Sequence, residues 1–207
     1  MAETARERLR LTVADIACER GGRLLFSGLG FSLGAGEALL LKGPNGAGKT
    51  SLLMIIAGLL RPLEGEARLA AEGGDERELP EEAHLVGHRD GLKSQLSACE
   101  NLSFWRAMLG APGLTPEAGL AALGLPHVPH LPCAFLSAGQ RRRVALARLL
   151  VSRRPLWLLD EPTAALDAAS RGLLAELMRG HLASGGLIVA ATHEPIGIAA
   201  AEIEVGR

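Results

Sequence analysis

One segment of the chain has the residue types and the spacing that bind phosphate. Residues 43–50 read Gly-Pro-Asn-Gly-Ala-Gly-Lys-Thr and match the pattern G-x-x-x-x-G-K-[ST]. The glycines let successive backbone N–H groups turn towards phosphate oxygens, and the start of a following helix adds partial positive charge. We expect Lys49 to reach the β- and γ-phosphates of a nucleotide and the Thr50 hydroxyl to bind Mg²⁺. The expected nucleotide contacts are Gly43, Pro44, Asn45, Gly46, Ala47, Gly48, Lys49, Thr50 and Ser51.

The context of this segment argues against a chance match, which average residue usage gives in about one chain in a hundred. An apolar run at Ala38–Lys42 predicts a buried strand before it, and the pattern of Gly48–Leu60 predicts a helix after it. A phosphate-binding loop joins a strand to a helix in this way. The sequence therefore favours a nucleotide site over a simple glycine-rich turn.

An acidic pair follows a second predicted strand. The apolar run Leu156–Leu159 ends at Asp160 and Glu161. We expect Asp160 to hold Mg²⁺ through water and Glu161 to act as the general base on the attacking water. Taken alone, the pair could instead open a helix, whose amino end favours negative charge.

A histidine follows a third predicted strand. His193 comes just after Leu187–Ala191, and ligands collect at the carboxyl ends of strands in open α/β sheets. A neutral imidazole donates one hydrogen bond and accepts another, so His193 can link a γ-phosphate to Glu161. A lone histidine here could also be structural.

A serine precedes a basic helical stretch. Residues 136–140 read Leu-Ser-Ala-Gly-Gln, and three arginines follow at 141–143. This pattern is typical of a serine-capped amphipathic helix with an exposed basic start. It also leaves small residues with free N–H groups at a helix start, which is an arrangement that binds anions.

The order of the elements predicts an α/β fold with a mixed, mainly parallel sheet. A hairpin formed by Leu9–Ala17 and Leu29–Leu33 adds an amino-terminal antiparallel part. We expect one domain, with a core lobe at residues 1–87 and 153–207 and an inserted helical lobe at residues 88–152. The other expected elements are strands at Glu64–Ala71 and His84–Gly87, an acidic loop at Gly73–Glu82, and helices at Asp167–Ser184 and Pro195–Ala200.

Composition narrows the possible functions. The chain has 22 Lys and Arg against 23 Asp and Glu, a net charge of −1, which argues against nucleic acid as a partner. The three cysteines lack Cys-x-x-Cys spacing and fit a reduced, cytosolic compartment. The longest apolar run, Leu52–Leu60, is far shorter than the roughly 20 residues that span a membrane. The first residues mix Glu with Arg and do not resemble a signal peptide.

Together the motifs resemble the nucleotide-binding domains of ABC transporters, because they occur in that family's order. The motifs are residues 43–50, 136–140, 156–161 and 165–167 and His193. Ala138 stands where the family's signature normally has glycine. Within the family, the chain is similar to the ATP-binding subunits of bacterial haem exporters for cytochrome c maturation. The segments that carry this closer resemblance are residues 18–29, 87–88, 91–93, 100–102, 136–149 and 192–195.

The resemblance implies an ATPase that uses ATP and Mg²⁺, with Lys49, Glu161 and His193 as its catalytic residues. It implies that Ser137, Gly139 and Gln140 contact the ATP of a second copy, so that two ATP molecules lie between two chains in a two-fold dimer. It further implies permease subunits of the haem-export type, an indirect link to a periplasmic haem chaperone, and a peripheral place on the cytoplasmic face of the bacterial inner membrane. A different exporter, of lipid, drug or ion, and a soluble ATP switch remain alternatives.

Two positions depart from the family pattern. His88 stands where a switch glutamine usually follows the strand after the phosphate loop's helix, and we expect it to contact the bound ATP. Arg20 stands where an aromatic side chain usually stacks on adenine. A guanidinium plane can also stack on a base, so Arg20 is the expected base contact.

Overall fold

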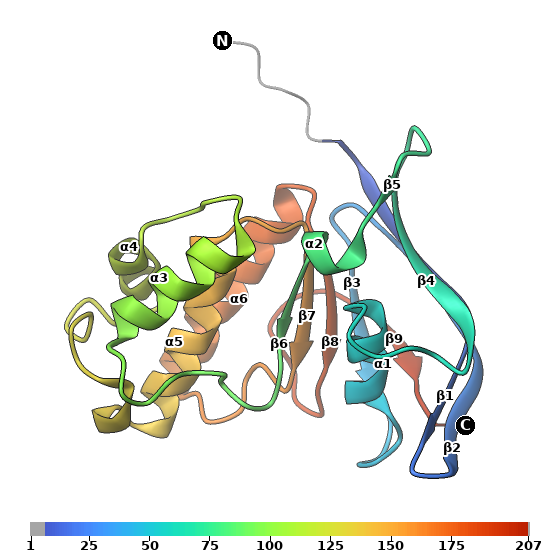
Figure 1. Cartoon of the computed structure of the whole chain (residues 1–207), viewed down its shortest axis with the longest axis horizontal. Coiled ribbons are helices and arrows are strands. Elements are labelled where there is room, and N and C mark those ends of the chain that lie inside the picture. Colours follow the sequence, from blue (N-terminus) through green and yellow to red (C-terminus); the bar gives the residue numbers. More distant parts are fainter. Residues whose placement is uncertain (1–6, 207) are drawn as a thin grey trace.

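The structure is a computed structural model that describes residues 7–206. Two sheets and a group of helices lie side by side, with the antiparallel sheet at one end of the molecule and the helical group at the other (Figure 1). A five-stranded sheet stands between them and carries the ends of the strands at which the predicted site residues lie.

The predicted amino-terminal hairpin is confirmed, with longer strands than expected. Strands β1 (Leu9–Arg20) and β2 (Arg23–Gly34) pair antiparallel around Gly21 and Gly22, which both have positive φ. Strand β4 (Glu64–Ala71), with the predicted bounds, pairs with β1. With β5 (Glu76–Arg77) at its edge, the sheet has the order β2-β1-β4-β5. The predicted acidic loop contains two short elements, β5 (Glu76–Arg77) and helix α2 (Leu79–Glu82).

The central sheet is parallel throughout the described residues. Its order is β6-β7-β8-β3-β9, and all four pairs of neighbours are parallel. The prediction of a mixed core sheet is therefore wrong in this detail, because the antiparallel strands pair with one another in the separate amino-terminal sheet. Its strands are β3 (Ala38–Lys42), β6 (Ala83–Val86), β7 (Leu156–Asp160), β8 (Leu187–Ala191) and β9 (Ala201–Glu204).

The last part of the chain differs from the prediction. Residues 195–200 form bends around Gly197, whose φ is 75°, and not the predicted helix. The chain then forms β9, which the sequence did not reveal, because alanine and glutamate favour strands weakly. Pairing with β3, from Leu39 opposite Ala201 onwards, provides the partner that makes this segment a strand.

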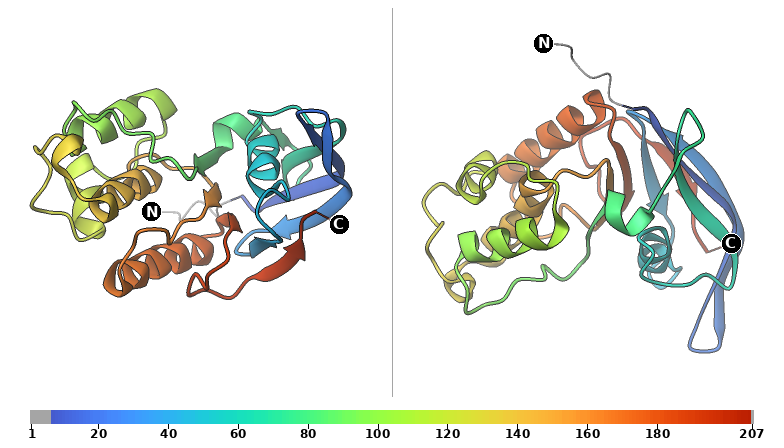
Figure 2. Two further views of the ribbon diagram at one scale, coloured as in Figure 1. Left: turned by 90° about the horizontal axis from the view of Figure 1, so that it is seen from below. Right: turned by 45° about the horizontal axis from the view of Figure 1, so that its top comes forward.

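Helices α1 and α6 pack against the sheets, and three other helices form a separate group. Helix α1 (Lys49–Ile56) lies between the two sheets and ends before the predicted limit, because the chain turns at Gly58 with φ 70°. Helix α6 (Ala168–Ala183) begins at its cap Asp167, as predicted. Helices α3 (Ala98–Leu109), α4 (Pro116–Ala122) and α5 (Ala138–Val151) and the 3₁₀ turn at Cys133–Phe135 form the helical group (Figure 2).

Two hydrophobic clusters hold these layers together. One joins the antiparallel sheet and α1 to one face of the parallel sheet, through residues such as Leu41, Leu52 and Leu158. The other joins the opposite face of the parallel sheet to α3–α6, through residues such as Leu102 and Leu159. The second cluster continues from the helical group into the core, so the division into lobes at residues 88 and 152 stays a prediction. No helix among the described residues has the length and apolarity to cross a membrane.

Candidate nucleotide-binding site

The loop between β3 and α1 is shaped by glycines that no other residue can replace. Gly43 has φ 130°, and a Cβ there would come within 2.4 Å of the Val205 carbonyl oxygen. Gly48 has φ 104°, and a Cβ there would come within 2.7 Å of the Phe26 ring. The loop is therefore curled by its sequence, as binding of phosphate by backbone N–H groups requires.

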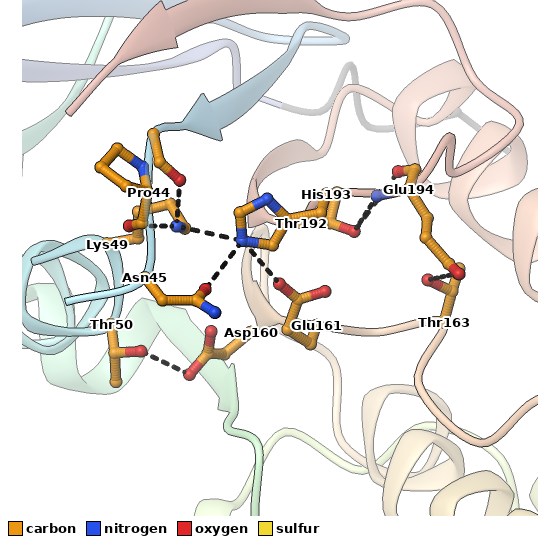
Figure 3. A network of polar contacts seen from close by, with 11 residues as sticks. Pro44, Asn45, Lys49, Thr50, Asp160, Glu161, Thr163, Thr192, His193 and Glu194 are labelled. Carbon is orange, nitrogen blue, oxygen red and sulfur yellow. Dashed lines mark hydrogen bonds and ion pairs between the residues drawn. The ribbon is translucent and has the colours of Figure 1, made fainter. Parts of the chain in front are cut away.

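Lys49 lies inside this curl. Its side chain belongs to the first turn of α1, and the residue is only 8% exposed. Its Nζ donates to the carbonyl oxygens of Gly43, at 2.6 Å, and Pro44, at 3.0 Å (Figure 3). The ammonium group is thus held at the mouth of the loop, where the predicted phosphates would lie.

Thr50 and Asp160 bring two oxygen ligands together. The Thr50 hydroxyl donates to Asp160 Oδ2 at 2.8 Å, although the two residues come from α1 and from the end of β7. Hydroxyl and carboxylate oxygens suit a hard cation such as Mg²⁺. No group of three or more His, Cys, Asp or Glu side chains within residues 7–206 could hold a metal alone. A cation here therefore needs phosphate oxygens or water to complete its shell.

His193 lies beside Lys49, Asn45 and Glu161. Its Nε2 is 3.3 Å from Lys49 Nζ, 3.1 Å from Asn45 Oδ1 and 3.9 Å from Glu161 Oε1 (Figure 3). Nε2 accepts from Lys49 when unprotonated and donates to Asn45 when protonated. Whether Nε2 bonds to Lys49 or to Asn45 therefore depends on the tautomer of the ring.

Glu161 has a backbone conformation that is rare for its type. Its φ is 47°, in the left-handed region that favours glycine. Its N–H donates to the Ala191 carbonyl oxygen at 2.8 Å, which ties it to the end of β8. Its side chain remains partly exposed and faces His193.

A cavity of about 420 Å³ joins most of the predicted contacts. Arg20 and His88, the two residues that depart from the family pattern, line it together with the phosphate loop and the acidic pair. The lining residues are Arg20, Leu25, Asn45, Gly46, Gly48, Lys49, Thr50, Ser51, His88, Asp160 and Glu161. A larger cavity, about 720 Å³, lies against β4 and α2 and contains none of these residues.

The predicted segment Ser137–Gln140 is not part of this cavity. Ser137 caps α5: its Oγ accepts from the Gln140 N–H at 3.2 Å, and Gln140 Oε1 accepts from the Ser137 N–H at 2.8 Å. Gly139 is close to the Ala165 carbonyl oxygen, which would lie 2.8 Å from a Cβ. The structure therefore brings the phosphate loop and the acidic pair together, and it places the predicted contacts at residues 137–140 elsewhere on the surface.

One residue of the site was missed by the sequence analysis. The basic start of α5 was expected to be exposed, but Arg142 is only 3% exposed. Its guanidinium donates to the backbone carbonyls of Asp160 and Glu161, both at 2.8 Å. Burial lowers the pKa of Arg142, and the nearby carboxylates of Asp90, Asp160 and Glu161 raise it. Three consecutive arginines give no sequence signal for which of them is buried.

The fold and the cavity define a P-loop ATPase, and comparison with known proteins narrows this class. Residues 26–164 match the family model described as ABC transporter. Solved structures agree on the fold: a putative ABC transporter ATP-binding protein from Pyrococcus furiosus has a TM-score of 0.79 at 21% identity, covering 95% of this chain and 97% of that one. A bacterial Atm1-family ABC exporter with ATP bound has a TM-score of 0.78 at 23% identity, over 99% of this chain and 40% of that one.

Curated relatives are similar over nearly their whole length. Proteins called cytochrome c biogenesis ATP-binding export protein CcmA from Rhodopseudomonas palustris strain BisB18 and Nitrobacter winogradskyi are 59% and 56% identical, each covering 96% of this chain and 98% of that protein. The chain belongs to the ABC transporter family and, within it, to the CcmA group of ATP-binding proteins. The predictions of the family, the α/β fold and an ATP-hydrolysing subunit are confirmed.

Proposed function

We propose that this chain is the ATPase subunit of a membrane complex that exports haem for cytochrome c biogenesis. The observation that carries the ATPase chemistry is the cavity in which Lys49, Thr50, Asp160 and Glu161 converge. The biological role is supported by the relatives, which are named for cytochrome c biogenesis and export. The cargo itself is recognised by partner subunits, so it leaves little trace in this chain.

Each cavity residue has a distinct proposed role. Lys49 moves its donors from the loop carbonyls to the β- and γ-phosphates, which have the same acceptor chemistry and more charge. Thr50 would hold Mg²⁺ directly and Asp160 would hold it through water, and the bound ion would supply positive charge beside the phosphates. Arg20 covers the base, beside Leu25.

Glu161 and His193 act on the attacking water. The Glu161 carboxylate orients this water and accepts its proton, as a general base must lie within hydrogen-bond reach of the proton that it takes. His193 contacts the γ-phosphate and keeps Glu161 in place from the other side. His88 lines the same cavity and takes the role of a switch glutamine.

The second half of the site comes from a second copy of the chain. The N–H groups of Ala138 and Gly139 make no hydrogen bond within the described residues, and the first turn of α5 contains no acidic side chain. An open helix start of this kind attracts anions. Ser137, Gly139 and Gln140 of one copy cover the ATP held by Lys49 of the other, which closes a two-fold dimer.

The chain works as a peripheral subunit on the cytoplasmic face of the bacterial inner membrane. We assign its attachment to permease subunits of the haem-export type, which pass haem towards a periplasmic chaperone. Membrane association of the full-length chain is the test. Co-purification of a multi-spanning partner, and loss of c-type cytochromes on deletion, support this role. Absence of any membrane partner contradicts it and favours a soluble ATP switch, while a partner without cytochrome loss favours another cargo.

The ATPase chemistry is tested by Glu161→Gln, with Glu194→Gln as the matched control. Glu194 lies near the same sheet edge, but its side chain contacts Thr163 (Figure 3). It also pairs with Arg171. Glu161→Gln is expected to bind ATP, to lose about 100-fold or more in turnover, and to accumulate as a dimer in ATP. Glu194→Gln is expected to hydrolyse ATP normally. Wild-type turnover of Glu161→Gln contradicts the proposed base.

A further inference from the structure

Arg142 donates hydrogen bonds to two separate segments that border the nucleotide cavity. Its Nη2 donates to the carbonyl oxygens of Asp160 and Glu161, both at 2.8 Å. Its Nη1 donates to the Gly87 carbonyl oxygen at 2.8 Å and lies 3.4 Å from Asp90 Oδ1. Residues 87–90 include His88, which lines the same cavity as Glu161. One buried guanidinium therefore fixes the relative positions of His88 and Glu161.

Glu161, which accepts one of these hydrogen bonds, has a strained backbone. A non-glycine residue at φ 47° is costly and persists only where its surroundings hold it in place. The Glu161 N–H donates to the Ala191 carbonyl oxygen, and the Glu161 carbonyl oxygen accepts from Arg142 at 2.8 Å and from the Ala164 N–H at 3.1 Å. Because these bonds lie on both sides of the strained residue, they determine where its carboxylate points, and the bond from Arg142 is the one that reaches it from α5.

Arg142 also connects this carboxylate to α5. The residue lies in the second turn of the helix that Ser137 caps. Five residues of helix span about 7.5 Å, so a displacement of the α5 start moves the guanidinium as a rigid unit. The planar guanidinium reaches several acceptors in a fixed fork, which a lysine ammonium cannot reproduce.

We propose that Arg142 is a positioning residue for ATP hydrolysis: from α5 it holds the Glu161 backbone and the His88 segment in the geometry that activates the attacking water. This inference rests on the proposed ATPase chemistry. It predicts that loss of the Arg142 bonds impairs turnover and leaves nucleotide binding intact, because Lys49 and the phosphate loop do not touch Arg142.

Arg148 provides a matched control on the same helix. It is also buried, donates to the Leu85 carbonyl oxygen, and stacks on Trp105 with its guanidinium carbon 4.3 Å from the ring centroid. It makes no bond to residues 160–161. A merely structural arginine on α5 should therefore behave as Arg148 does.

The experiment compares Arg142→Gln, Arg142→Lys and Arg148→Gln in the full-length chain. Thermal unfolding, equilibrium binding of ATP and steady-state turnover are measured for each. For Arg142→Gln we expect kcat to fall by about tenfold or more, since a small misplacement of a catalytic group is enough, with the Kd for ATP within about threefold of wild type. Arg142→Lys keeps the charge and serves as the second variant if Arg142→Gln does not fold. It is also expected to lose kcat without losing ATP affinity, with a smaller loss of kcat.

Arg148→Gln is expected to lose stability and to keep its kcat within about twofold. The inference is overturned if both Arg142 variants that fold keep wild-type kcat, if their kcat loss comes with an equal loss of ATP affinity, or if Arg148→Gln loses as much kcat as Arg142→Gln. Glu161→Gln separates the two proposals. If that variant hydrolyses ATP normally, the proposed function fails; if only the Arg142 variants do, the positioning role alone fails.

Discussion

Helices α3 and α5 begin with the same capping box but differ in what surrounds it. Ser97 and Glu100 close the box of α3, and Ser137 and Gln140 close that of α5. At α3 the next two N–H groups, of residues 98 and 99, donate to the carbonyl oxygens of Leu131 and Pro129. At α5 the corresponding N–H groups make no hydrogen bond within residues 7–206.

The difference teaches that the same local pattern can be structural or available for binding. Hydrogen bonds from the Ser97 backbone and side chain lower the pKa of Glu100, so a carboxylate already occupies the positive end of α3. The start of α5 has no such charge and faces solvent. The N–H groups at the start of α3 are bonded within the chain, and those at the start of α5 are left open, as the proposed contact with the ATP of another copy requires.

The largest expected effect concerns Lys49 in the phosphate loop. Lys49→Ala removes the cation from the phosphate loop, and loss of a charged hydrogen bond costs about 2–3 kcal/mol, or roughly 100-fold in the Kd for ATP. Lys42→Ala is the control, because Lys42 precedes the same loop but pairs with Glu202. Equilibrium binding of ATP distinguishes them. Equal affinity in both variants contradicts the assigned role of Lys49.

The two helix starts are compared directly by Ser137→Ala and Ser97→Ala. Each removes a serine cap, which costs about 1 kcal/mol of stability. Only Ser137→Ala is expected to lose turnover, by about tenfold, because only that serine is proposed to face ATP in the dimer. The stability of both variants is read from urea unfolding and the activity from phosphate release. Equal activities would show that α5 is capped for structural reasons alone.

The stability of the fold is expected to depend on pH through His84, which lies where β6 meets the end of α5. His84 on β6 donates to the carbonyl oxygen of Ser152 at 2.9 Å, and burial lowers its pKa from 6.5 to about 3, with Arg148, Arg154 and His181 adding to the effect. The unfolded chain takes up a proton on this histidine below pH 6.5 and the folded chain does not. Stability from this group is therefore complete above pH 6.5 and decreases as the pH falls towards 3.

This acid sensitivity is measured by urea unfolding between pH 4 and 7. In wild type, His84 contributes a slope of up to about 1.4 kcal/mol per pH unit below 6.5. His84→Gln is expected to be less stable at neutral pH and to lack this part of the slope. The exposed His127→Gln serves as control and keeps it. An unchanged slope in His84→Gln contradicts the buried neutral state.

The smallest expected effect concerns the contact with the adenine base of ATP. Arg20→Phe replaces a guanidinium plane with an aromatic ring and is expected to tighten ATP binding by about threefold, within the range of one aromatic contact. Arg23→Phe is the control, because Arg23 pairs with Arg20 across the hairpin but does not line the cavity. Weaker binding in Arg20→Phe contradicts a stacking role for this position.

Local patterns account for what the sequence predicted. The phosphate loop, Asp160, Glu161 and His193 each follow an apolar strand, and a parallel sheet brings the ends of such strands to one edge. The features that the sequence missed depend on contacts between distant segments. Strand β9 forms because β3 provides a partner, and the burial of Arg142 depends on carbonyl groups far away in the chain. Neither has a signature in its own segment.

The central claim is that each ATP lies between Lys49 of one copy and Ser137 of another. A structure of Glu161→Gln with ATP and Mg²⁺ tests it most directly. We predict a two-fold dimer in which each triphosphate contacts the phosphate loop of one protomer and the α5 start of its partner. A structure in which each ATP contacts a single protomer, with both α5 starts facing solvent, would contradict the account.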